Sequence, residues 1–159
     1  MKFIQIWRAM PSLVYQQADL LRDEVAEALE RQGLPVPADM RRECLLFILW
    51  SVHVALMNIR PVFLRAPLVW LHRRRIMRRE CDLLAHYDRR RIEALYGVWS
   101  IMATQTQQGW EIAMTPRSAR IFADKAAAGK ANLSSVMLER LFAILRQRNS
   151  ICLSAVLAN

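Results

Sequence analysis

An arginine-rich stretch at residues 72–91, HRRRIMRRECDLLAHYDRRR, offers the clearest chemistry in the sequence. It holds eight arginines in twenty residues. A guanidinium group donates two parallel hydrogen bonds to a phosphate or a carboxylate, so such a stretch suits an anionic partner. On a helical wheel most of these arginines share one broad face, opposite apolar side chains. That face consists of Arg74, Arg75, Arg78, Arg79, Arg89 and Arg90, together with His86.

The arginine face predicts a site for the backbone of RNA or DNA. From Arg75 to Arg90 a helix rises roughly 22 Å, which is enough to reach several phosphates. Trp70, just before the arginines, would add stacking on an unpaired base. No motif for sequence-specific recognition accompanies the stretch, so we expect little sequence preference. Further basic residues would extend the contact if the fold places them alongside: Arg117, Arg120, Lys125 and Lys130.

Other interpretations of the same stretch stay open. A run of charges is often a solvated helix face, and the acidic segment 19–30 could pack across the arginines, within one chain or between two. The chain would then be a protein-interaction module, either an oligomer or a subunit of a larger complex.

Another alternative is a peripheral or inserted membrane protein. In that case 44–59 or 61–71 would enter the bilayer and the arginines would meet the headgroups.

Four charged residues of the stretch fall on or beside its apolar face, namely Arg73, Glu80, Asp88 and Arg91. Buried charges need partners. We therefore expect ion pairs here rather than catalysis, for example Asp88 with Arg91 or a pair between Glu80 and another helix.

The sequence carries no recognisable catalytic or metal-binding pattern. His53, His72 and His86 do not have the spacing of a metal motif. The three cysteines, at 44, 81 and 152, match neither a disulfide framework nor a zinc site. A glycine-rich phosphate loop and a nucleophile elbow are also missing. We therefore expect a protein that is not an enzyme, with no catalytic residues, no metal and no cofactor.

Length and composition limit the folds that can position these residues. The chain has 159 residues, a length typical of one domain, and 54% of them are hydrophobic. With only 4 glycines and 6 prolines it has too few turn residues for a sheet protein, which favours an all-α fold. The net charge of +9 fits an anionic partner. The N-terminus lacks the apolar run of a secretory signal, so we expect a cytoplasmic location.

Hydrophobic spacing predicts a compact bundle of five to six helices. Pro11 is expected to end an N-terminal arm at 1–11, and an acidic amphipathic helix follows at 12–33, closed by Gly33. The segment 38–60 is apolar nearly all round and predicts a buried central helix. A long arginine-rich amphipathic helix is expected at 68–108, because no proline interrupts it. C-terminal helices are expected within 116–158, beginning after Thr115-Pro116 and again after Asn132 or Ser134.

Overall fold

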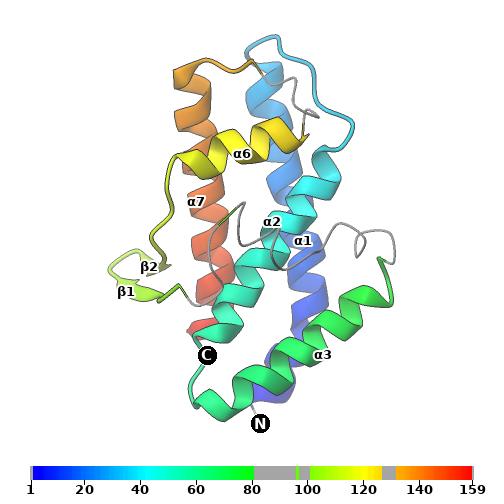
Figure 1. The fold of residues 1–159 in the computed structure, drawn as a ribbon, viewed down its shortest axis with the longest axis vertical. Coiled ribbons are helices and arrows are strands. Elements are labelled where there is room, and N and C mark those ends of the chain that lie inside the picture. Colours follow the sequence, from blue (N-terminus) through cyan, green and yellow to red (C-terminus); the bar gives the residue numbers. More distant parts are fainter. Residues whose placement is uncertain (1, 81–95, 97–100, 127–131, 159) are drawn as a thin grey trace.

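Three long helices, α1 (Lys2–Glu30), α2 (Met40–Met57) and α7 (Ser135–Leu157), pack against one another at the centre of the protein. The computed structural model describes residues 2–80, 96, 101–126 and 132–158. Figure 1 shows the three helices along the long axis, with α6 (Arg117–Ala126) crossing one end and α3 (Arg65–Met77) crossing the other. The predicted helical bundle is confirmed, since the described residues form five α-helices, a short 3-10 turn and one small hairpin.

The predicted acidic helix buries its apolar positions. These positions recur every three or four residues, so they form one stripe along α1, which packs against α2 and α7. Gly33, at φ +66°, ends the helical segment as predicted, because glycine adopts a left-handed backbone at little cost. The buried stripe consists of Val14, Ala18, Leu21, Val25 and Ala28.

The predicted break at Pro11 is wrong. Instead of an arm at 1–11 and a new helix at 12, α1 runs through Pro11 without interruption. Proline has no N–H to donate to the carbonyl of Trp7, four residues earlier. Arg75 of α3 supplies this donor: its Nη1 lies 2.9 Å from the Trp7 carbonyl oxygen, and its guanidinium lies 4.5 Å from the centre of the Trp7 ring. A side chain from a distant segment therefore stabilises the helix at the proline.

The central position of α2 follows from its apolar sequence. The helix spans Met40–Met57 within the predicted 38–60, and every residue from Glu43 to Val52 is buried. Phe47 and Trp50 of α2 form an aromatic cluster with Tyr96 and with Phe122 of α6. The ring centre of Phe47 lies 5.3 Å from that of Tyr96 and 6.2 Å from that of Phe122, both edge to face. This geometry favours aromatic pairs and ties α6 to the core.

The arginine-rich helix is shorter than the predicted 68–108. α3 begins at Arg65, with Pro67 in its first turn, where the missing N–H would have no helical partner anyway. It ends at Met77. Residues 104–111 are not helical, because β1 (Thr104–Thr106) and β2 (Gly109–Glu111) pair there as an antiparallel hairpin. Residues 81–95 and 97–100 of the predicted helix lie outside the described residues.

Contacts with α7 explain why the segment before α6 forms a hairpin. The backbone N–H of Trp110 donates to Ser154 Oγ at 3.2 Å, and Glu111 forms a 2.9 Å ion pair with Arg146. Gly109 has φ +123°, and a Cβ there would lie 2.9 Å from Ser154 Oγ. Only glycine fits this backbone without displacing the serine.

The C-terminal helices begin where their capping residues predict. α6 starts directly after Thr115-Pro116. Ser134 caps α7, since its side-chain oxygen accepts a hydrogen bond from the N–H of Met137 at 3.2 Å. The prediction of two helices within 116–158 is therefore confirmed for the described residues.

A charged network joins α7 to α1. Arg148, only 9% exposed, donates from Nε to Glu24 Oε2 at 2.9 Å and from Nη2 to Glu24 Oε1. Its Nη1 donates to Gln17 Oε1 at 3.0 Å. Two parallel bonds to one carboxylate are the strongest arrangement that arginine forms with an acid. Glu24, an acidic residue of α1, is thus already paired with a residue of α7.

Replacing Arg148 with methionine is expected to lower the free energy of unfolding by about 2 kcal/mol. Losing one partner of a well-buried ion pair costs roughly 3 to 5 kcal/mol, and the partial exposure of Glu24 reduces this. Urea denaturation followed by circular dichroism measures the change. Arg146→Met is the matched control, because the exposed Arg146–Glu111 pair should contribute less than about 1 kcal/mol. Equal losses in the two variants would contradict the structural role of Arg148.

Candidate nucleic-acid interface

The two sides of α3 differ because of helical spacing. Leu68, His72 and Ile76 recur every four residues and are buried against the rest of the bundle. The opposite side is exposed. Exposed residues also flank the helix: Phe63 lies in the 3-10 turn Val62–Leu64 that precedes α3, and Arg78 and Arg79 follow its last residue, Met77. We call the exposed set Phe63, Trp70, Arg73, Arg74, Arg78 and Arg79 the arginine-aromatic face.

The arginine-aromatic face places a tryptophan beside exposed guanidinium groups. Trp70 is 56% exposed, and the guanidinium carbon of Arg74 lies 5.0 Å from the centre of its ring. In the part of the chain that the structure describes, no carboxylate lies within 4.0 Å of any of the four guanidinium groups of the face. Within the described part of the chain these side chains are therefore available to an external anion.

Two sequence-predicted positions on α3 differ from expectation. Arg73 was expected on or beside the apolar face, but it is exposed. Arg75 is half-buried and holds Trp7. The prediction placed residues 72–91 on one continuous helix. In the structure, contacts of α3 with α1 and α2 decide which of its residues are buried.

Burial also changes the chemistry of His72. Removal from water disfavours the charged imidazolium and lowers the pKa of His72 to about 4. At neutral pH this side chain is uncharged, and it adds nothing to the positive charge of the face.

The acidic segment of α1 does not cover the arginine-aromatic face within the described part of one chain. Arg22 pairs with Asp19 and Asp23, and Glu24 binds Arg148.

The predicted pair between Glu80 and another helix is present, because Glu80 lies 3.9 Å from Arg41 of α2.

The predicted extension of the contact does not adjoin α3. Arg117, Arg120 and Lys125 are exposed on α6, at the opposite end of the bundle (Figure 1). These three residues therefore do not lie alongside the arginines of α3. Lys130 and the predicted face residues Arg89 and Arg90 lie outside the described residues.

Phe63 is a candidate residue that the sequence analysis missed. It is 74% exposed. Pro61 and Pro67 suggest a linker between helices, whereas the structure places Pro67 inside α3. The spacing of seven residues between Phe63 and Trp70 is the signal that would have found it, because two helical turns separate residues on one face.

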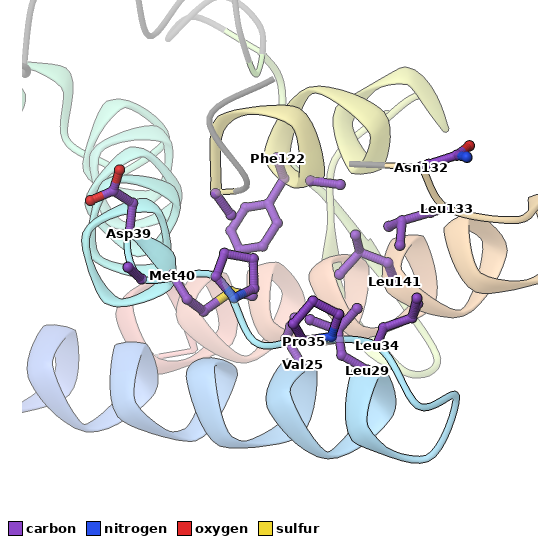
Figure 2. A pocket seen from close by; sticks show the side chains of 14 residues that line it. Val25, Leu29, Leu34, Pro35, Asp39, Met40, Phe122, Asn132, Leu133 and Leu141 are labelled. Atoms are coloured by element: carbon purple, nitrogen blue, oxygen red, sulfur yellow. The ribbon is translucent and has the colours of Figure 1, made fainter. Parts of the chain in front are cut away.

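A separate pocket lies at the end of the bundle opposite α3. Figure 2 shows the pocket between the end of α1, the loop before α2, α6 and the start of α7. Its volume is about 450 Å³, and its walls are mostly apolar, with Asp39 and Asn132 as the polar lining residues. The Asp39 carboxylate already pairs with Arg42 at 3.0 Å.

The described cysteines and acidic side chains offer no reactive nucleophile and no metal site. Burial raises the pKa of the Cys44 thiol, and it raises that of Cys152 to about 12, so both remain protonated at neutral pH. Among the described residues no group of three or more histidine, cysteine or acidic side chains is arranged to hold a metal ion.

None of the described helices combines the length and the apolar character needed to span a membrane.

Comparison with known proteins gives no family for this chain. No protein-family model, curated protein or solved structure matches it significantly.

Proposed function

We propose that this protein is a non-enzymatic accessory protein that binds the phosphate backbone of nucleic acid through the arginine-aromatic face. The observation that carries the proposal is the set of four exposed guanidinium groups on α3 and directly after its end, none of which has a carboxylate partner among the described residues. Phosphate contacts of this kind position a protein on nucleic acid without reading its sequence. The chain's net charge of +9 would favour association with any polyanion.

Fluorescence anisotropy of a labelled single-stranded RNA and a labelled duplex DNA, titrated between about 50 and 200 mM salt, tests this function. Each phosphate contact contributes roughly 0.7 to 0.9 to the slope of log affinity against log salt concentration. The triple variant Arg74→Gln, Arg78→Gln, Arg79→Gln is expected to bind more weakly and to lower that slope by about 2 to 3.

The far end of the bundle offers a matched control. Arg117→Gln, Arg120→Gln, Lys125→Gln also removes three positive charges, and each triple variant has a net charge of +9 − 3 = +6. We expect the control to keep most of the affinity and of the salt dependence. Equal losses in both variants would show attraction by net charge alone and overturn the proposed site. Absence of wild-type binding at about 50 mM salt would overturn the function.

A second candidate is an anionic membrane surface. Val62 and Phe63 are 64% and 74% exposed, and arginines follow them along α3. Apolar side chains in the acyl region with arginines at the headgroups are typical of interfacial helices. Co-sedimentation with vesicles of phosphatidylserine and phosphatidylcholine tests this candidate. Binding to these vesicles, with none to nucleic acid, would favour it over the first.

A further inference from the structure

The arginine-aromatic face has a fixed order along α3. Phe63 precedes the helix and Trp70 lies in its first half, whereas the arginines lie in its second half or directly after its end. Phe63 lies in the 3-10 turn Val62–Leu64, and Trp70 follows seven residues later within α3. Phe63 and Trp70 are also the only aromatic side chains among the exposed large hydrophobic residues that the structure describes. Phosphate binding alone does not need exposed rings.

Trp70 has the geometry of a stacking platform. Arg74 lies over its ring at 5.0 Å, and among the described residues no other ring contact holds it. More than half of its side chain is exposed. Because Arg74 covers one face of the ring, a base would stack on the other face, with the guanidinium of Arg74 close to a neighbouring phosphate.

We infer that the face prefers single-stranded nucleic acid and that a base stacks on Trp70. This inference rests on the proposed function and names the substrate class of the same site. In a duplex the flat faces of the bases are covered by their neighbours, so an exposed ring gains little from them. In a single strand an unpaired base turns its face to the protein, and stacking on an aromatic side chain strengthens binding with little dependence on sequence.

The test uses one 12-nucleotide strand that carries 2-aminopurine, free or annealed to its complement, with the full chain at low salt. Wild-type protein is expected to bind the free strand at least tenfold more tightly than the duplex and to quench the 2-aminopurine emission. Trp70→Leu should weaken binding to the free strand between about 5-fold and 100-fold, since it removes one stacked base. Affinity for the duplex should change less than twofold.

The conservative variant Trp70→Phe separates stacking from loss of apolar surface. It retains an aromatic ring, so it should keep most of the preference for the free strand and most of the quenching. Circular dichroism checks that each variant is folded. Trp70 is exposed, and we expect little change in stability.

The possible results separate this inference from the proposed function. Equal binding of free strand and duplex, or equal weakening of both by Trp70→Leu, would overturn the inference and leave backbone binding intact. Absence of binding to either nucleic acid would overturn both. Vesicle binding that depends on Trp70, without nucleic-acid binding, would also overturn both in favour of the membrane surface.

Discussion

Replacing Phe47 with alanine is expected to lower the free energy of unfolding by about 4 kcal/mol. Phe47 is fully buried in α2 and contacts the rings of Trp50, Tyr96 and Phe122. The variant loses the burial of the ring and leaves a cavity that the surrounding aromatic side chains fill only in part. Small domains are stable by roughly 5 to 15 kcal/mol, so this loss is a large fraction of the total.

Urea denaturation of the wild type and the variant measures this effect. Phe63→Ala is the matched control, because it removes the same side chain from an exposed position and should change stability by less than about 0.5 kcal/mol. Phe47→Leu keeps most of the buried volume, is expected to cost about 1.5 kcal/mol or less, and provides a measurement if the alanine variant does not fold. Similar losses in Phe47→Ala and Phe63→Ala would contradict a core centred on Phe47.

Stability is expected to fall by up to about 3 kcal/mol between pH 6.5 and pH 4 because of His72. Burial lowers the pKa of His72 to about 4 in the folded protein, from the ordinary value of 6.5. Between these values the unfolded chain binds a proton at this residue and the folded chain does not. Each pH unit in that interval costs about 1.4 kcal/mol, and above pH 6.5 the effect is absent.

The contribution of His72 is measured as a difference, because carboxylates also titrate at low pH. Urea denaturation at several pH values should show a flatter pH dependence for His72→Phe than for the wild type. The two proteins are compared by the slope of the free energy of unfolding against pH. A different stability of the phenylalanine variant at pH 7 therefore does not affect the result. A His72 ring that titrates near pH 6.5 in NMR spectra of the folded protein would rule out the buried neutral state.

Pro11 shows where local sequence patterns are insufficient. The residues around it predict a helix end, because proline removes a backbone donor. The structure restores this donor with Arg75, which lies 68 residues along the chain from Trp7, whose carbonyl it binds. A sequence pattern that considers only neighbouring residues has no information on such a partner.

The hairpin at 104–111 has a similar cause. The prediction that the arginine-rich helix continues into this segment relied on the absence of an interrupting proline. Contacts between β2 and α7 decide the outcome instead, including the hydrogen bond from Trp110 to Ser154 and the position of Gly109 beside the same serine. Tertiary contacts of this kind override weak local preferences.

The sequence by itself determined the all-α class, the buried stripe of α1, the central α2 and the helix starts at Thr115-Pro116 and Ser134. These features depend on hydrophobic spacing and on capping groups within a few residues, which are local properties. Tertiary structure decided which basic side chains remain available. Arg75 holds Trp7 and Arg148 binds Glu24, whereas Arg74 stays exposed over Trp70. The three arginines have the same chemistry, and only the elements packed around each one decide whether it stabilises the fold or faces solvent.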